Sequence, residues 1–260
     1  MNFKQYIKSV AINCAKKIEC NPLRYNDILV ALFHDIEEEI GDFDPRYTVN
    51  GEVFKAQIDL LLQNEVSWLT ASELLTQLDK QQFLHSAVCI TFDDGKLSSY
   101  QPILEMVRSG GKATQFIIPN RMAEKGIMSW EQISSLNDAG VEIGSHTLSH
   151  PDLTKLNEQK IKHELHDSKA IIEDKLGKEV VSFAYPYGAW NQHVAALVQE
   201  AGYKIAFTTQ HIYASNEFAT VNIPRFEPAN LVEMNDIFYG AGHYFYRCLK
   251  KALIIQAKFK

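Results

Sequence analysis

Short apolar runs alternate with helix-period segments along the middle of the chain, and this alternation constrains the fold more than any other feature of the sequence. The apolar runs cover residues 28–33, 87–92, 113–118, 141–145, 180–184 and 205–208. Strands that alternate with helices in this way form βα units around a parallel sheet. We therefore expect an α/β fold with a barrel-like parallel sheet whose first strand lies before residue 40.

Capping residues mark the ends of the expected helices. Residues 70–73 and 129–132 each have a Ser or Thr followed three positions later by Glu or Gln, which is the pattern of a capping box. Asn157 is expected to cap a helix that ends before Gly177. The apolar face of that helix has four residues at helical spacing: Ile161, Leu165, Ile172 and Leu176. Further helices are expected over residues 53–62 and 191–201.

The composition is that of a globular protein. The chain has 260 residues, 46% of them hydrophobic and 22% charged, and α/β barrels of about 250 residues commonly form one domain. We expect a single catalytic domain over residues 1–260 with a core over about 28–226. The cysteines include no C-x-x-C pair, which fits a reducing compartment. No apolar stretch has the length of a secretory signal or a membrane-spanning helix, so we expect a cytoplasmic protein.

Charge is unevenly distributed along the chain. The two ends, residues 1–20 and 244–260, together carry +8, so the rest carries −14 within a net charge of −6. An acidic body excludes nucleic-acid binding, which needs a basic face. Both ends mix apolar and basic residues. They are expected either to attach peripherally to the inner face of an anionic membrane or to pack their apolar residues on the barrel wall.

Two adjacent carboxylates follow the apolar run 87–92. Asp93 and Asp94 precede Gly95, which lets the backbone turn. Alone, an Asp-Asp-Gly sequence also fits a strand-end turn with solvated aspartates. Buried carboxylates, in contrast, need a partner charge or a metal ion.

Two histidines follow the apolar run 141–145. His146 and His150 lie four residues apart, and Pro151 disfavours a helical conformation at His150, so we expect a turn here. Alone, the pair also fits two surface histidines. With Asp94 it forms an Asp-His-His set, and three protein ligands with open positions are typical of a catalytic Zn²⁺ site.

A third motif, residues 183–188, contains Pro186, Tyr187 and Gly188 and follows another expected strand. By itself it fits either a βα turn or the rigid wall of a site. All three motifs follow strands, and parallel barrels build their active sites at the carboxyl ends of strands. We therefore expect the three motifs to meet in one active site.

Together these residues resemble the polysaccharide deacetylases with the NodB homology domain, carbohydrate esterase family 4. The resemblance covers residues 28–226 and rests on residues 91–95 and 146–151. It implies an irregular or incomplete (β/α) barrel of about seven strands. It also implies a metal-dependent hydrolase that removes the N-acetyl group from an amino sugar of a polysaccharide or of a glycan precursor, including a lipid-linked one.

The resemblance also assigns roles to residues. Asp93 would be the catalytic base, while Asp94, His146 and His150 would bind a divalent metal, most readily Zn²⁺, with Co²⁺, Ni²⁺ or Mn²⁺ as alternatives. Pro186 and Tyr187 would bind substrate, and the Tyr187 backbone N–H would stabilise the oxyanion.

The chain departs from the family pattern in two places. Ala184 stands where the third motif usually has an arginine that contacts the base, and Arg225 would either take over that space at the substrate site or lie on the surface. The family's acid lies in a C-terminal L-x-H motif, whereas this chain has Leu-Phe-His at residues 32–34, as in the circularly permuted poly-N-acetylglucosamine deacetylases. We predict His34 as the acid rather than a structural histidine, with His211 and His243 in reserve.

Two other functions fit the same motifs. Members of this fold also hydrolyse formamides and small cyclic amides, and a chain without activity would be a carbohydrate-binding protein. Retention of both aspartates and both histidines argues against the inactive protein.

Overall fold

The structure is a computed structural model that describes residues 28–37, 47–63, 66–80, 87–122, 124–210 and 219–227. All of them lie within one unit of the chain, Tyr25–Ala229. The two basic ends, 1–20 and 244–260, and the reserve candidates His211 and His243 lie outside the described residues. In the described part, no helix combines the length and the apolar character that crossing a membrane requires.

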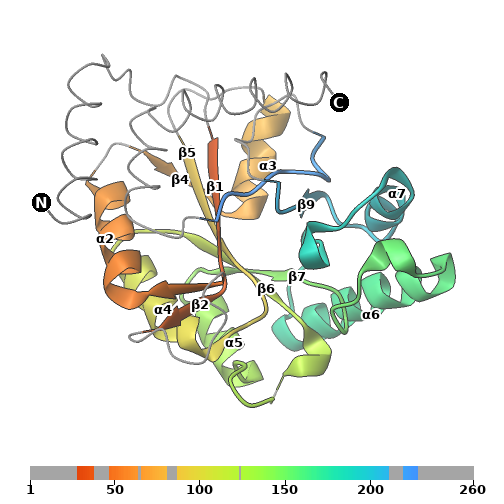
Figure 1. Cartoon of the computed structure of the whole chain (residues 1–260), viewed down its shortest axis with the longest axis horizontal. Coiled ribbons are helices and arrows are strands. Elements are labelled where there is room, and N and C mark those ends of the chain that lie inside the picture. Colours follow the sequence, from red (N-terminus) through yellow and green to blue (C-terminus); the bar gives the residue numbers. More distant parts are fainter. Residues whose placement is uncertain are drawn as a thin grey trace, which may run out of the picture. The chain divides into compact units, whose positions relative to one another are not determined.

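Parallel strands form one curled sheet in the order β1-β5-β6-β7-β8-β9, with β4 pairing with the start of β5 (Figure 1). The strands are β1 (Ile28–Phe33), β4 (Ser67–Trp68), β5 (Ala87–Phe92), β6 (Ala113–Ile117), β7 (Glu142–Ser145), β8 (Ser182–Ala184) and β9 (Ile205–Phe207). Strands β2 (Asp35–Glu37) and β3 (Thr48–Asn50) form a separate parallel pair. The predicted α/β fold with a curled parallel sheet of about seven strands is confirmed.

A short segment, residues 223–226, bridges the two edges of the curled sheet. Ile223 pairs with Phe207 of β9, and Phe226 pairs with Ala31 of β1. Phe226 also exchanges two backbone hydrogen bonds of 2.8 Å with β1. Because this segment is bonded to both edges, it holds Arg225 between the first and last strands of the sheet.

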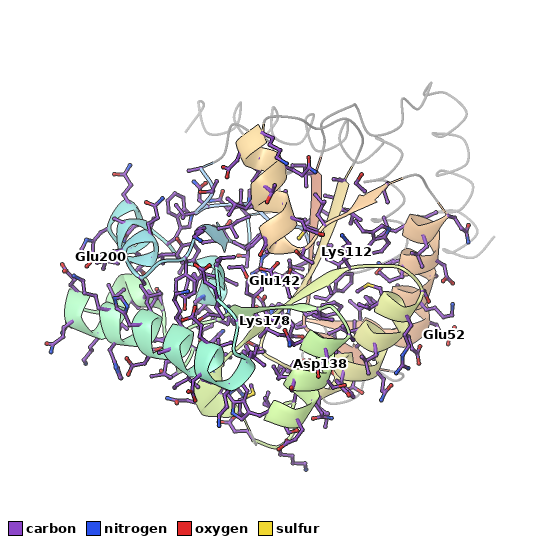
Figure 2. The ribbon with its side chains drawn as sticks, turned by 180° about the vertical axis from the view of Figure 1, so that it is seen from behind. Glu52, Lys112, Asp138, Glu142, Lys178 and Glu200 are labelled. Carbon is purple, nitrogen blue, oxygen red and sulfur yellow. The ribbon has the colours of Figure 1, made fainter. Side chains whose placement is uncertain are left out.

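Helices lie around the outside of the sheet (Figure 1). They are α2 (Gly51–Leu62), α3 (Ala71–Lys80), α4 (Tyr100–Arg108), α5 (Trp130–Asp138), α6 (Glu158–Leu176) and α7 (Gln192–Glu200), with short 3-10 helices η1 (Leu97–Ser99), η2 (Pro119–Arg121), η3 (Leu153–Lys155) and η4 (Pro186–Gly188). Figure 2 shows charged side chains on and between these helices, of which Glu52, Asp138, Lys178 and Glu200 are exposed. The helices thus present a polar surface behind the sheet.

The predicted caps fix where these helices begin. Ser129 and Gln132 form both bonds of a capping box at α5, and Thr70 and Glu73 exchange the same two bonds at the start of α3. Asn157 accepts a hydrogen bond from the third residue of α6, which supplies one of the partners that the first helical N–H groups lack. Helix α6 ends at left-handed Gly177, as predicted.

Apolar side chains from the strands and α3 form the core. The cluster includes Ile28, Cys89, Phe116, Phe207 and Leu74, each at most 2% exposed. This core packs α3 against the sheet.

Candidate active site

Residues that follow five strands meet in one pocket of about 510 Å³. His34 follows β1, Asp93 follows β5, His146 follows β7, Tyr187 lies beyond β8, and Thr209 lies beyond β9. The full lining is His34, Asp35, Tyr47, Asp93, Asp94, Lys96, His146, His150, Tyr187, Thr209 and Glu227. Carboxyl ends of parallel strands share one edge of a sheet, which explains why residues so far apart in sequence meet here. The volume lies in the range of small-molecule sites.

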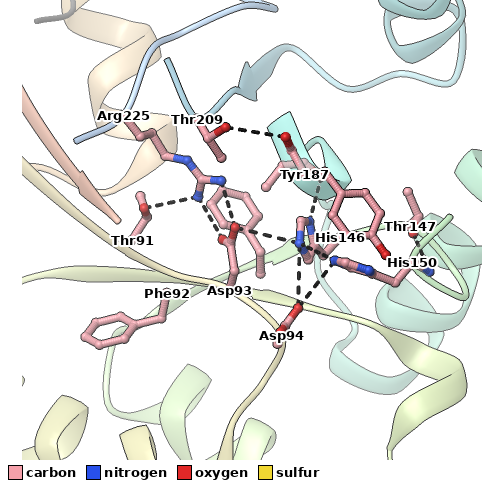
Figure 3. Close-up of polar contacts among 12 residues, drawn as sticks. Thr91, Phe92, Asp93, Asp94, His146, Thr147, His150, Tyr187, Thr209 and Arg225 are labelled. Carbon is pink, nitrogen blue, oxygen red and sulfur yellow. Dashed lines mark hydrogen bonds and ion pairs between the residues drawn. The ribbon is translucent and has the colours of Figure 1, made fainter. Parts of the chain in front are cut away.

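Asp94, His146 and His150 point ligand atoms toward one another (Figure 3). The two Nε2 atoms are 3.1 Å apart, and Asp94 Oδ1 lies 3.7 Å from that of His146 and 3.5 Å from that of His150. Within the described ranges, this is the one group of three such residues whose ligand atoms all lie within 4.8 Å of one another. Asp94 Oδ1 is buried and has no hydrogen-bond partner among the described residues. A divalent cation fits this set, because it would satisfy the orphaned oxygen and both ring nitrogens at once.

The protonation of both rings suits metal binding. His146 Nδ1 lies 2.8 Å from the carbonyl oxygen of Ala184, which can only accept, so Nδ1 carries the proton and Nε2 presents a lone pair to the cluster. Burial and the neighbouring His146 lower the pKa of His150 to about 4, against the attraction of Asp94. His150 is therefore neutral near pH 7, which is the form that ligates metals.

Four non-glycine residues of the described chain have a left-handed backbone; three line the pocket, and the fourth directly follows His146. They are Asp94 (φ 68°), Thr147 (φ 66°), His150 (φ 66°) and Tyr187 (φ 60°). Such conformations cost about 1–3 kcal/mol each and persist only where the surroundings enforce them. One such enforcing contact is the His150 backbone N–H, which donates to Thr147 Oγ1 at 2.8 Å.

Asp93 is paired with Arg225. Two guanidinium nitrogens lie 2.7 Å from the two carboxylate oxygens, and the side chains of Arg225 and Asp93 are 0% and 2% exposed. Burial raises the pKa of Asp93, but the charge and the hydrogen bonds of Arg225 lower it, and the pKa lies well below its ordinary value. Asp93 is therefore an ionised carboxylate that also lies 3.7 Å from His146 Nε2.

His34 lies beside Asp93 at the same edge of the sheet. Phe33 pairs with Phe92, so His34 and Asp93 are the next residues on neighbouring parallel strands. The Asp93 N–H donates to the Phe33 carbonyl at 3.0 Å, and both side chains line the pocket. The His34 ring packs against Tyr47, with 5.0 Å between ring centroids. His34 and Asp93 thus line the same pocket from neighbouring strands, and the role of His34 as the acid stays a prediction.

Tyr187 lies on the opposite wall, where its ring centroid is 4.8 Å from that of His150 and its side chain is 68% exposed. Gly188 follows with φ 64°, and a Cβ there would come within 2.2 Å of Thr209 Oγ1. The turn that presents Tyr187 therefore requires glycine at position 188.

Two residues predicted to bind substrate do not reach the pocket wall. Pro186 is buried and starts the η4 turn, so it shapes the backbone that presents Tyr187. Arg225 is buried, and its guanidinium donates to Asp93, to the Thr208 carbonyl and to Thr91 Oγ1. Both residues thus contact residues that line the pocket without lining it themselves, and a role in substrate binding stays a prediction.

Other pocket residues escaped the sequence analysis. Lys96 Nζ lies 3.7 Å from both Asp35 Oδ2 and Asp94 Oδ2, and Ser98 donates to Asp35 Oδ1 at 2.8 Å. Lys96 directly follows Gly95, and Asp35 directly follows His34. Their position next to the motifs could therefore have predicted that they lie in the pocket. Tyr47 follows residues with no recognisable pattern and had no such signal.

Comparison with known proteins places these motifs in one family. The family model for polysaccharide deacetylase matches residues 80–206, which contain both aspartates and both histidines. YxkH of Bacillus subtilis, a relative named for the same family, is 32% identical over 168 residues, which are 63% of this chain and 60% of YxkH. The chain thus resembles the polysaccharide deacetylase family over the residues that carry both motifs.

Two further deacetylases match a longer segment. The poly-beta-1,6-N-acetyl-D-glucosamine N-deacetylase of Staphylococcus aureus is 26% identical over 196 residues, which are 69% of this chain and 67% of that protein. Among solved structures, the Streptococcus pyogenes deacetylase PplD in complex with acetate superposes with a TM-score of 0.73 at 22% identity, covering 82% of this chain and 99% of PplD. The similarity to PplD supports the same fold for this chain.

Proposed function

We propose that the protein is a metal-dependent hydrolase that removes the N-acetyl group from an amino sugar of a polysaccharide or glycan precursor. The observation that carries this proposal is the convergence of Asp94, His146 and His150 beside the ionised Asp93 in one pocket. The match to the polysaccharide deacetylase family and the relative named for poly-N-acetylglucosamine support the substrate class.

The proposed ligands are Asp94 Oδ1 and the Nε2 atoms of His146 and His150, with Zn²⁺ as the first choice of metal. A divalent cation bound there would lower the pKa of water and polarise the amide carbonyl. Asp93 would then take a proton from the water that adds to the carbonyl carbon. Arg225 keeps Asp93 ionised and fixes both of its oxygens, so the base has one orientation.

His34 would complete the reaction by protonating the sugar nitrogen as the C–N bond breaks, which yields acetate and a free amine. Because His34 lies beside Asp93 in the same pocket, the proposed acid and base can act on the same acetamide group of the substrate. The backbone N–H of Tyr187 would donate to the developing oxyanion. The exposed Tyr187 ring supplies a surface on which a sugar ring can stack.

The test measures acetate and new amine from N-acetylglucosamine oligomers. The purified chain is stripped with a chelator and reloaded with Zn²⁺, Co²⁺, Ni²⁺ or Mn²⁺. We expect equal amounts of acetate and amine from the loaded protein and none from the stripped protein. If the loaded protein hydrolysed formamides or cyclic amides but no N-acetylated oligomer, the small-amide function would replace this one.

A further inference from the structure

Glu164 of helix α6 holds the loop that carries both histidines. Its Oε2 atom accepts hydrogen bonds from the backbone N–H groups of Leu148 and Ser149, each at 2.9 Å. Its Oε1 atom accepts from Ser149 Oγ at 2.6 Å. One carboxylate thus receives three bonds from the two residues in the middle of the 146–150 loop.

The position of Glu164 is unusual for a charged side chain. It is 8% exposed and lies on the buried face of α6 with Ile161, Leu165 and Ser168. No basic side chain of the described residues forms an ion pair with it, so its charge is balanced by N–H and O–H donors. Burying a carboxylate costs free energy, and an apolar residue on this face would avoid that cost. We therefore expect Glu164 to have a role other than packing α6 against the sheet.

The conformation of the 146–150 loop indicates what this role is. Thr147 and His150, on either side of the two residues that Glu164 binds, both have a left-handed backbone. Without Glu164, the Leu148 and Ser149 N–H groups would be left without this acceptor, and the strained turn would lose a main restraint. His150 would then no longer be held 3.5 Å from Asp94 Oδ1.

We propose that Glu164 is a positioning residue of the metal site. By binding Leu148 and Ser149, it holds His146 and His150 in the orientation in which both Nε2 atoms face Asp94. This inference rests on the proposed function, since it takes the Asp-His-His set to be a metal site. It goes further in assigning metal affinity to a helix residue that does not line the pocket.

Glu173 provides a matched control on the same helix. Its Oε1 atom also accepts a backbone N–H, that of Val180 at 2.8 Å, and a side-chain donor, Lys169 Nζ at 2.6 Å. Glu173 is not part of the pocket lining. Replacing either glutamate removes comparable hydrogen bonds from α6, but only one of the two changes touches the histidine loop.

The experiment measures the affinity of the full chain for Co²⁺ by its visible absorption, together with thermal unfolding of the metal-free protein. Glu164→Met keeps the side-chain length and removes the acceptors, and we expect Co²⁺ binding to weaken about 10–100-fold with an altered spectrum. Glu164→Gln keeps one acceptor oxygen and loses the other, so its Co²⁺ affinity should lie clearly between those of wild type and Glu164→Met. Glu173→Met should lower the unfolding temperature and leave Co²⁺ affinity within about twofold of wild type.

Two results would overturn the inference: wild-type Co²⁺ affinity in Glu164→Met, or an equal loss of affinity in Glu173→Met. If Glu164→Met does not fold, Glu164→Gln decides, because its amide cannot accept the Ser149 hydroxyl and N–H groups as the carboxylate does. An unchanged affinity and spectrum there would also overturn it. Failure of the proposed function looks different: the wild type would bind Co²⁺ and release no acetate, while the ranking of the variants would persist.

Discussion

Arg225 and Asp93 form a two-point ion pair although they lie 132 positions apart, with each carboxylate oxygen 2.7 Å from a different guanidinium nitrogen. The arginine comes from the segment that bridges β9 and β1, whereas the family's third motif usually supplies it from the strand end that here has Ala184. Because both groups are buried, neither has water as a substitute partner.

Arg225→Met should therefore leave a buried, uncompensated carboxylate. We expect a loss of about 3–5 kcal/mol in the free energy of unfolding, measured by urea denaturation. With the guanidinium gone, burial would dominate and raise the pKa of Asp93, so the acid side of the pH–rate profile should move to higher pH. The double variant Arg225→Met/Asp93→Asn removes the charge as well and should regain part of the stability. If the single variant were as stable as wild type, the ion pair would not have the importance assigned to it.

Asp93→Asn should abolish turnover and leave metal content nearly unchanged, because it removes a base and no ligand. Metal content by elemental analysis and acetate release measure the two effects separately. Loss of the metal from this variant would show that Asp93 is a ligand instead.

His146→Ala and His150→Ala should each lose both metal and activity, because each removes one of three ligands. His193→Ala is the control, since His193 is a surface histidine with 58% side-chain exposure. A His150→Ala protein that bound one metal per chain with wild-type affinity would rule out the Asp-His-His set.

His34→Gln should lower kcat while metal content stays at the wild-type level, because the side chain lies beside Asp93 but outside the ligand set. Loss of a general acid costs about 10²–10⁴-fold in rate. A variant with wild-type kcat would move the search for the acid to His211 or His243.

Gly188→Ala and Gly177→Ala separate steric conflict from backbone strain, since both glycines are left-handed at φ 64° and 65°. Nothing lies within 4 Å of a Cβ at position 177, so that change should cost about 1 kcal/mol of stability and leave activity intact. At position 188 the new Cβ would meet Thr209, so we expect a larger loss and reduced turnover through displacement of Tyr187. If both variants lost the same free energy of unfolding in urea denaturation, this explanation of the turn at Gly188 would be contradicted.

The sequence predicted those parts of the fold that local patterns control. β1 and β5 have the expected bounds because their six-residue apolar runs are buried throughout. Strand β8 begins at Ser182 and not at residue 180, since Val180 donates its N–H to Glu173 and is therefore bonded to α6. Strand β6 ends one residue early because Ile118 caps the η2 turn.

The site was predictable where a motif or its neighbour carried the signal. Asp93, Asp94, His146 and His150 stand in two specific motifs, and His34 lies one residue beyond an apolar run. Glu164 could not be found in this way, because its importance comes from bonds to a loop 15 and 16 residues away. The burial of Arg225 likewise depends on strand pairing across the sheet, which no local pattern records.

The four left-handed residues have a consequence for engineering the protein against heat. Replacing such a residue with glycine would relieve the backbone strain at that position. At Asp94 and His150, the same change would delete a proposed ligand, and at Thr147 and Tyr187 it would loosen the turns that present the others. Searches for heat-resistant variants should therefore begin on the outer faces of the helices, where sequence can change without altering the pocket.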